Sequence, residues 1–319
     1  MNTFAKLKSF IEENDNFVLV GHKNADGDCI GTMSAFAVVL EKLNKSFELL
    51  VADPVPYGYG FLKYVKDFKV VSEYRCKGRP LILFECGTIA RCGITLKDYG
   101  KTVNFDHHPD NSFYADINVV DAEASSVGEM AAIFFKDFFN DLIDSHIANA
   151  LYTAIHTDTG GFSYSNVRKT TFDISSFLMT KGLDNQLVCN EVYGNNRIEK
   201  TRLLGHYLEN LKVEKLRNFS LCYGVITVED LVKFGCTSRD TENFANYPRG
   251  IRGVDVGVFF LEIEKGVFKV SLRSKGKIVV NKVASRLSGG GHKFAAGCTV
   301  KGSFREVLET VKNEFLKDE

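Results

Sequence analysis

Four stretches of this chain share one pattern, in which a short apolar run is followed directly by acidic or imidazole side chains. They are Phe17–Val20 before His22 to Asp28, Pro80–Phe84 before Glu85, Thr102–Phe105 before Asp106-His107-His108, and the stretch ending at Thr157 before Asp158. Continuous apolar runs followed by turn residues are typical of buried parallel strands. The carboxyl ends of such strands lie side by side, where open α/β sheets bind ligands. One such carboxylate would pass as a loop residue or helix N-cap, but four favour a common site.

The segments between these runs have helical or strand patterns. We expect a helix over Ile30–Leu43, a strand over Phe47–Val51, a helix over Val127–Phe139 with a serine of the pair Ser125-Ser126 as N-cap, and a helix over Asp144–Thr157. Alternating strands and helices predict a parallel, doubly wound α/β sheet of the Rossmann type.

The second half of the chain changes character and predicts a smaller α/β domain. Expected strands cover residues 219–228, 254–263, 267–272 and 278–280, with a hairpin near Glu264-Lys265-Gly266 and a polar connecting helix over 197–211. We therefore divide the chain into a catalytic domain (1–190), a linker helix (191–212) and a substrate-binding domain (213–319).

A basic window with a glycine loop lies within this second domain. Between Glu264 and Glu306 there is no acidic residue but there are ten Lys or Arg, and the window contains Gly289-Gly290-Gly291-His292. Glycines allow a backbone to approach a ligand closely and leave N–H groups free for an anion. Because the helix-like pair Ala295-Ala296 follows, we expect an anion-binding loop at a helix start rather than a plain flexible loop.

Composition limits the classes of function. The 319 residues carry a formal net charge of +0, so no whole-molecule field attracts long nucleic acid, and no apolar stretch is long enough for a membrane span. Residues 1–16 lack the apolar core of a secretory signal. The eight Cys are scattered without a C-x-x-C pair, which is typical of reduced thiols in a cytoplasmic protein. We interpret Cys29, Cys86 and Cys92 as packing residues rather than metal ligands.

The polar groups after the runs form a set of candidate metal ligands. They are His22, Asp26, Asp28, Glu85, His107 and Asp158. Carboxylates with imidazole suit Mn²⁺ or a related divalent ion. The set is too large for one ion that keeps water sites open, and it fits two ions about 3.5–4 Å apart, as in two-metal hydrolases. We assign His22 and Asp26 to one ion, Asp28 and His107 to the other, and Glu85 and Asp158 to both.

Asp106 and His108 are left as candidate catalytic residues. Asp106 could hold a ring N–H of a neighbouring His and fix its tautomer, or it could simply cap a turn. His108 could bind phosphoryl oxygens or protonate a leaving alkoxide.

The motifs resemble, in order and over nearly the whole chain, those of the DHH phosphoesterases that carry the DHH-associated C-terminal domain. The segments that carry the resemblance are His22–Asp28, Asp106–His108, Ala124–Glu129, Thr157–Gly160 and Gly289–His292. The resemblance is strongest to the stand-alone bacterial nanoRNases, 3′-phosphoadenosine 5′-phosphate (pAp) phosphatases and phosphodiesterases acting downstream of cyclic di-AMP. It implies a dinuclear Mn²⁺ site, a substrate cleft between two domains, and often a homodimer.

The resemblance also implies roles for single residues. Asp106 would support a ligand without binding metal, His108 would face the scissile phosphate, and Arg273 and His292 would hold the far end of the substrate. One departure concerns Glu85, because the family commonly has Asp there. The longer side chain could bridge both ions or reach only one. Arg91 follows six residues later and could contact a substrate phosphate or form a surface salt bridge.

The expected function is therefore hydrolysis of short oligonucleotides and linear dinucleotides such as pApA and pGpG to 5′-mononucleotides, with cyclic di-AMP as a further candidate. A pAp phosphatase uses the same site and stays open as an alternative. So does a non-catalytic nucleotide sensor, which loss of ligands would signal. A pyrophosphatase and a long-strand exonuclease are weaker alternatives, because the former needs no base-sized cleft and the latter needs additional binding domains.

Overall fold

The computed structural model describes residues 3–317 and divides the chain into two compact units, Met1–Asn195 and Asn196–Glu319. They are called the first and second unit below. The outer limits of the predicted domains, residues 1 and 319, lie outside the described residues. The predicted linker helix corresponds to α7 (Ile198–Glu209), which the division places in the second unit.

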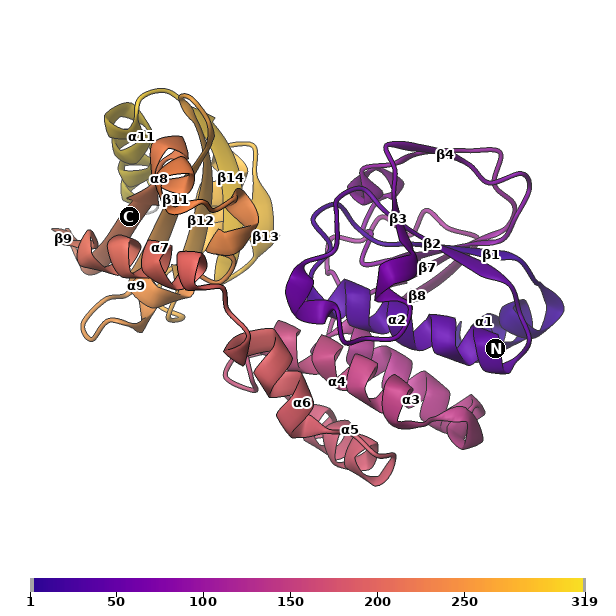
Figure 1. Cartoon of the computed structure of the whole chain (residues 1–319). Coiled ribbons are helices and arrows are strands. Elements are labelled where there is room, and N and C mark those ends of the chain that lie inside the picture. The colour runs from indigo at the N-terminus through magenta and orange to yellow at the C-terminus, as the bar shows by residue number, and fades with distance from the viewer. Residues whose placement is uncertain (1–2, 318–319) are drawn as a thin grey trace. The chain divides into compact units, whose positions relative to one another are not determined.

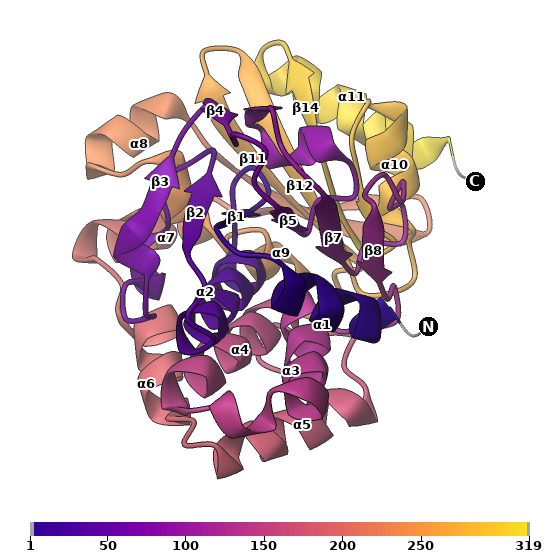
Figure 2. The same cartoon turned by 90° about the vertical axis from the view of Figure 1, so that its right-hand side faces the viewer.

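The first unit is built on a six-stranded sheet in which every pair of neighbours is parallel. Its order is β3-β2-β1-β5-β7-β8, which can be followed from strand to strand in Figure 2. The strands are β1 (Phe17–Val20), β2 (Phe47–Val51), β3 (Phe68–Val70), β5 (Leu81–Phe84), β7 (Thr102–Asp106) and β8 (Ile117–Val120). From β1 the chain adds β2 and β3 on one side of the sheet and then β5, β7 and β8 on the other side. The boundary between β1 and β5 is therefore the topological switch point, where such sheets bind ligands. The Rossmann-like parallel α/β fold is confirmed.

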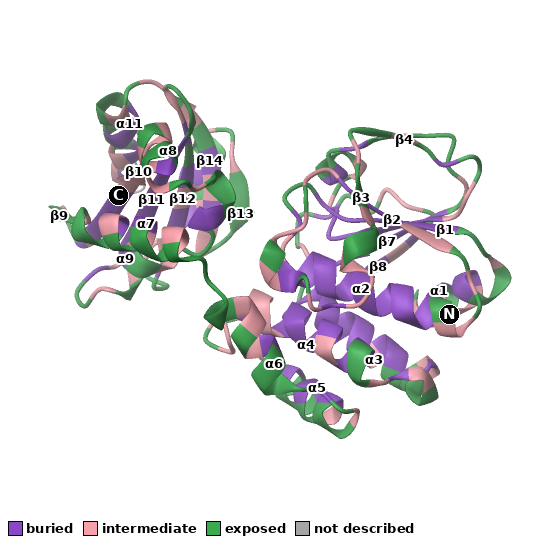
Figure 3. Cartoon of the chain, viewed as in Figure 1, coloured by how far each residue is buried: buried purple, intermediate pink, exposed green. Residues whose placement is uncertain are grey.

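Helices cover one face of this sheet (Figure 1). They are α1 (Thr3–Glu13), α2 (Gly27–Lys42), α3 (Val127–Phe138), α4 (Ser145–Asp158), α5 (Lys169–Thr180) and α6 (Asn185–Cys189), with a π-helical turn η5 (Asn190–Gly194). Helix α2 is buried from Gly27 to Leu40, as its continuous purple ribbon in Figure 3 shows. Its Phe36 packs edge-on against Phe84 of β5 and Phe105 of β7. The aromatic core therefore anchors the first turn of α2 beside the ends of these strands.

The other face of the sheet has no α-helix among residues 3–317, although helices were expected on both faces. A two-stranded parallel sheet, β4 (Glu73–Arg75) with β6 (Thr95–Lys97), and the 3₁₀ turn η3 (Ile89–Cys92) pack there instead. Further 3₁₀ turns are η1 (Tyr57–Tyr59), η2 (Val65–Asp67) and η4 (Asn140–Leu142). The buried Cys86 and Cys92 belong to this apolar layer, as expected for packing residues.

The predicted elements of the first unit are found within a few residues of their expected bounds. Strand β2 has the predicted bounds, and α3 begins after Ser126, whose side chain accepts from the backbone N–H of Glu129. Asp158 is the exception to the shared pattern, because it ends helix α4 rather than a strand. Three strand ends and one helix end therefore supply the candidate ligands.

The second unit has a mixed six-stranded sheet of order β13-β14-β12-β11-β10-β9. Only β10 and β11 are parallel, and the other neighbouring pairs are antiparallel. The strands are β9 (Lys212–Leu216), β10 (Phe219–Ile226), β11 (Val256–Glu264), β12 (Val267–Ser274), β13 (Gly290–His292) and β14 (Ala295–Lys301). The predicted hairpin at Gly266 joins β11 to β12.

Helices lie on both faces of this second sheet. Helices α10 (Val280–Arg286) and α11 (Phe304–Leu316) pack on one face, and α7, α8 (Val228–Phe234), α9 (Asn246–Gly250) and the 3₁₀ turn η6 (Ser238–Thr241) pack on the other. Two predictions are wrong here. Residues 278–280 are not a strand, because Val280 starts α10, and Ala295-Ala296 is not helical but opens β14. None of the described helices is long and apolar enough to cross a membrane.

Candidate metal centre

The first group of candidate ligands follows β1. His22 is buried, and its Nδ1 lies 2.9 Å from the carbonyl oxygen of Lys23. An N–H at Nδ1 donating to that carbonyl leaves the Nε2 lone pair facing outward, the arrangement of a metal-binding imidazole. Nε2 lies 3.7 Å from Asp26 Oδ1. Asp26 is also the N-cap of α2, accepting from the backbone N–H groups of Asp28 and Cys29.

Asp28 is held by backbone groups in the first turn of α2. Its two carboxylate oxygens accept from the N–H groups of Val127, at 2.8 Å, and Gly128, at 2.9 Å. These are the first N–H groups of α3, and a helix N-terminus favours negative charge. The motif around Ser125 to Glu129 therefore fixes Asp28, a residue about a hundred positions earlier in the chain.

Glu85 lies between two imidazoles at the switch point of the sheet. It follows β5 with a left-handed φ of 55° and is 3% exposed. Its Oε2 lies 3.7 Å from His22 Nε2, and its Oε1 lies 3.7 Å from His107 Nε2. Each carboxylate oxygen thus faces the ring of a different candidate ion position.

The Asp106-His107-His108 tripeptide ends β7, as predicted. His107 Nδ1 lies 3.1 Å from the carbonyl of Ala124, so its Nε2 also faces the acids, at 3.7 Å from Asp158 and 4.0 Å from Asp28. His108 Nδ1 lies 2.7 Å from Asp106 Oδ1. That same oxygen accepts from the backbone N–H groups of His107 and His108. Asp106 therefore combines the two functions left open above, as a turn cap and as the partner of a histidine ring.

Asparagines that the sequence analysis missed support two of the carboxylates. Asn111 donates to Asp106 Oδ2 at 2.5 Å. Asn166 donates to the Ser125 carbonyl at 2.8 Å and lies 3.5 Å from Asp158 Oδ2. Neither has a sequence signal, because both lie in irregular segments whose path depends on tertiary packing.

The pKa values show a surplus of buried negative charge. Burial, followed by the charges of Glu85 and Asp158, raises the pKa of Asp28 well above its usual range. Burial and neighbouring carboxylates likewise raise the pKa of Glu85, and burial raises the pKa of Asp158 to about 6. Burial would raise the pKa of Asp26, but the interaction with His22 lowers it to about 2. Burial would lower the pKa of His22 and His107, but the facing carboxylates raise both.

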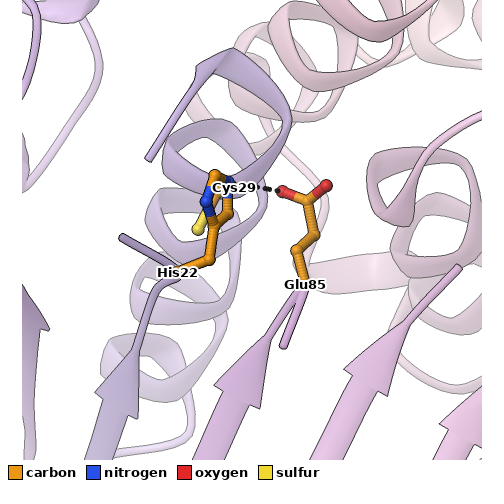
Figure 4. Close-up of side chains that lie close together, drawn as sticks. All are labelled: His22, Cys29 and Glu85. Carbon is orange, nitrogen blue, oxygen red and sulfur yellow. Dashed lines mark ion pairs between the residues drawn. The ribbon is translucent and has the colours of Figure 1, made fainter. Parts of the chain in front are cut away.

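These residues fit divalent cations. The Nε2 atoms of His22 and His107 lie 3.7–4.0 Å from the carboxylate oxygens that face them. These distances are too long for hydrogen bonds, but they suit groups that bind the same ion. Glu85 Oε2 accepts no hydrogen bond from the described residues, although it is buried. Three groups of possible metal ligands have their donor atoms close together. They are Asp28, His107 and Asp158; Glu85, His107 and His108; and His22, Glu85 and Cys29, the last shown in Figure 4. Cys29 was not predicted as a ligand.

Arg91 lies close to the first group. It is exposed in η3, its carbonyl accepts from Lys23 N–H, and its charge acts to lower the pKa of His22. It forms no ion pair with a carboxylate among residues 3–317, so the salt bridge that was one of its two alternatives is not found in the described part of the chain.

The second unit brings Arg273 and His292 into one row. Arg273 of β12 and His292 of β13 both pair with Ala295 of the intervening strand β14. Directly opposed residues point to the same face of a sheet, so the Arg273 guanidinium and the His292 imidazole flank a small residue on one surface. Lys269 and Ser271 continue this face along β12, because the alternate residues Val270 and Leu272 point into the core.

The glycine loop has a structural role that the sequence did not reveal. A Cβ at Gly289 would lie 2.1 Å from the carbonyl oxygen of Gly297, and Gly291 has a φ of 132°. Gly290 pairs directly with Gly297. The glycines thus allow β13 to pack tightly on β14, and the expected helix N-terminus for an anion does not form.

An open parallel sheet with imidazoles and carboxylates beside its switch point defines a Rossmann-like protein built to hold divalent cations. Residues 16–155 match the DHH family, N-terminal domain, and residues 218–317 match the DHHA1 domain. The chain therefore belongs to the DHH family of phosphoesterases.

Relatives match most of the chain. The chain is 27% identical to a probable bifunctional oligoribonuclease and PAP phosphatase NrnA of Streptococcus mutans, with 93% of each chain covered. It is 28% identical to the bifunctional oligoribonuclease and PAP phosphatase NrnA of Thermus thermophilus, over 93% of this chain and 89% of the relative. A crystal structure of an exopolyphosphatase-related protein from Bacteroides fragilis has a TM-score of 0.87 at 25% identity, covering 99% and 96% of the two chains.

Proposed function

We propose that this protein is a Mn²⁺-dependent phosphodiesterase that hydrolyses short oligonucleotides and linear dinucleotides, such as pApA and pGpG, to 5′-mononucleotides. The observation that carries the proposal is the position of Glu85 between His22 and His107, at 3.7 Å from each ring. A carboxylate between two sets of donors suits a pair of ions, which in hydrolases serve phosphoryl transfer. The names of the relatives as oligoribonucleases support the choice of substrate.

The residues divide into two ion positions under this proposal. His22 and Asp26 hold the first ion, Asp28 and His107 hold the second, and Glu85 and Asp158 serve both. Carboxylate and imidazole donors favour Mn²⁺ over Mg²⁺, which prefers oxygen ligands and keeps several waters. Ions bound there would supply Lewis-acid activation of water and neutralise charge on phosphoryl oxygens.

His108 is the proposed proton donor. Its Nδ1–H is directed to Asp106, so Nε2 is the nitrogen presented to a substrate. Burial would raise the pKa of Asp106, but the hydrogen bond and charge of His108, together with the hydrogen bond from Asn111, lower it. A ring held in this way can bind a phosphoryl oxygen and protonate the leaving alkoxide. Arg91 is proposed to contact a second phosphoryl oxygen.

The second unit is proposed to bind the end of the substrate that does not react. Arg273 and His292 would hold the terminal 5′-phosphate, and the small residues on the same face of β14, Ala295 and Gly297, would leave a flat surface for a base. The backbone N–H groups of the glycines in β13 and its turn would also donate hydrogen bonds to this phosphate. Binding energy from this remote end would orient the scissile phosphodiester.

The same site supports a second candidate activity, removal of the 3′-phosphate of pAp, which the names of the relatives include. We further propose a cytoplasmic homodimer. A nucleotide sensor without catalysis is disfavoured, because all six candidate ligands are present and lie together.

A substrate panel tests the proposal. Chelator-treated protein resupplied with Mn²⁺ is assayed against pApA, pGpG, pAp, cyclic di-AMP and a long single-stranded RNA, with Asp28→Asn as the inactive control. We expect the highest kcat/KM on the linear dinucleotides and lower values on cyclic di-AMP, which has no terminal phosphate. Full activity without metal, or equal kcat/KM on dinucleotide and long RNA, would contradict the proposal.

A further inference from the structure

A thiol lies among the donors of the first ion position. Cys29 is fully buried in the first turn of α2, one residue after Asp28. Its Sγ, a ring nitrogen of His22 and a carboxylate oxygen of Glu85 all lie within 4.8 Å of one another. Figure 4 shows His22 and Glu85 facing each other from the ends of β1 and β5, with Cys29 of α2 beside the His22 ring. The second group, Asp28, His107 and Asp158, has no thiol.

An independent observation points to a ligand at this position. Glu85 Oε2 is buried and accepts no hydrogen bond from the described residues, yet it faces His22 Nε2 at 3.7 Å. A buried carboxylate oxygen without a partner costs free energy unless a cation occupies the space in front of it. The left-handed backbone of Glu85, with φ 55°, holds the carboxylate in that direction.

The local packing fixes the thiol close to the strand end. A Cβ added at Gly21 would lie 2.7 Å from Cys29 Sγ, so the thiol occupies the space that a side chain at residue 21 would fill. The other neighbour of the sulfur is Met33 Sδ, at 3.8 Å, a weak partner. The thiol therefore lies beside the residue that precedes His22, and no strong hydrogen bond withholds it from an ion.

We propose that Cys29 is a further ligand of the first ion position, beside His22, Asp26 and Glu85, and that this position prefers a thiophilic ion such as Zn²⁺ or Co²⁺. The inference rests on the proposed two-ion function and deepens it, because the two positions would then differ in metal preference. On binding, the thiol gives its proton to solvent and the thiolate coordinates the ion.

The distances allow this with small movements. Zn–S bonds of about 2.3 Å and Zn–N bonds of about 2.0–2.1 Å place tetrahedral donors roughly 3.4–3.7 Å apart. The His22–Glu85 separation of 3.7 Å already has this value, and the thiol lies within 4.8 Å of both. Thiolate ligands select Zn²⁺ and related soft ions, whereas Mn²⁺ lies at the weak end of the divalent series. Glu85 is one methylene longer than the Asp common in the family. Its carboxylate can therefore reach an ion that lies closer to the sulfur.

Cobalt reports the donor set without reference to activity. The full chain is stripped with chelator and titrated with Co²⁺ while the near-ultraviolet thiolate-to-cobalt charge-transfer band is recorded and bound cobalt is counted by elemental analysis. We expect the band in the wild-type protein, its loss in Cys29→Ser, and at least a tenfold weaker first site in that variant. Cys92→Ser is the matched control, because Cys92 is equally buried in the first unit but bonds only to Ile94, and it should keep the band.

A measurement on the wild-type protein keeps the inference testable if Cys29→Ser does not fold. X-ray absorption of zinc-loaded protein should then show a sulfur at about 2.3 Å. Two bound cobalt ions without a charge-transfer band, a band that persists in Cys29→Ser, or zinc without a sulfur neighbour would each overturn the role of Cys29 and leave the proposed function intact. A protein that binds no divalent ion would overturn both.

Discussion

Neutralising Glu85 should stabilise the metal-free protein and destabilise the metal-bound protein relative to wild type. The Glu85 carboxylate is 3% exposed, and burial together with the charges of Asp26, Asp158 and Asp106 raises its pKa well above the usual 4.5. A carboxyl group whose pKa is raised on folding destabilises the folded state at every pH above its unfolded value, and the penalty is absent at lower pH. The substitution Glu85→Gln removes this penalty at neutral pH.

The size of the effect follows from the geometry. A buried charged group with an unsatisfied oxygen costs about 1–3 kcal/mol or more, and each kcal/mol shifts Tm by roughly 2–4 °C in a domain of this size. We therefore expect a rise in Tm of at least about 2 °C for chelator-treated Glu85→Gln. Wild type should gain about 2.7 kcal/mol in free energy of unfolding when Mn²⁺ is present at a hundred times its Kd. The variant should lose most of this gain, because an amide is a weaker ligand.

Calorimetry with and without Mn²⁺ measures both expected changes in Tm. It is the suitable method because the chain has no Trp to report unfolding by fluorescence. Glu129→Gln is the matched control. Glu129 is equally buried, but Ser125, Thr171 and Thr170 donate to it along with Arg168. These hydrogen bonds outweigh burial and lower its pKa, so its neutralisation should decrease Tm and preserve the Mn²⁺ gain. If metal-free Glu85→Gln is also less stable than wild type, or keeps the full Mn²⁺ gain, the reasoning about buried charge at Glu85 is wrong.

Three further expectations concern catalysis, substrate binding and pH. His108→Ala should retain both metal ions in elemental analysis while kcat falls by about 10²–10⁴, the usual contribution of acid–base catalysis; loss of metal would refute the role assigned to the ring. Arg273→Ala and His292→Ala should raise KM for pApA without changing metal content, and an unchanged KM would remove this row from the substrate site. Mn²⁺ affinity measured by titration calorimetry should fall as pH decreases through about 6, because protons compete with the ion for Asp158, whose pKa burial raises to about 6; a Kd that is constant between pH of about 5 and 8 would contradict this.

The centre in the first unit could be predicted largely from sequence because its chemistry follows directly from strand ends. Residues 17–20 and 81–84 are apolar without alternation, and residues 102–105 are buried throughout although they include Thr102 and Asn104, since the sheet is buried on both faces. The parallel pairing places the carboxyl ends of these strands at one edge. Residues one to three positions beyond those strand ends therefore lie close together, regardless of the path of the connecting loops. Asp158 was included by its motif, although a helix rather than a strand delivers it.

The proposed role of Cys29 could not be predicted in the same way. A cysteine after Asp28 is compatible with packing in the helix core, which is how such residues behave in most proteins. Its place among the donors depends on the absence of a side chain at Gly21 and on the backbone conformation of Glu85, two features that become related only in three dimensions. Neither relation can be inferred from the spacing of these residues in the sequence.

The proposed substrate-binding row of the second unit depends on strand register, and this explains why its local structure was predicted wrongly while its residues were named by resemblance. Ala295 and Ala296 have high helix propensity, but pairing with Arg273 and Leu272 overrides it. A slip of one residue between β12 and β14 would turn Arg273 and His292 to opposite faces. The tight contact of Gly289 with Gly297 and the unusual φ of Gly291 set the position of β13 on β14, and with it the row. The glycines thus position His292 through the register of β13 on β14, and under the proposed function they would affect substrate recognition in this way.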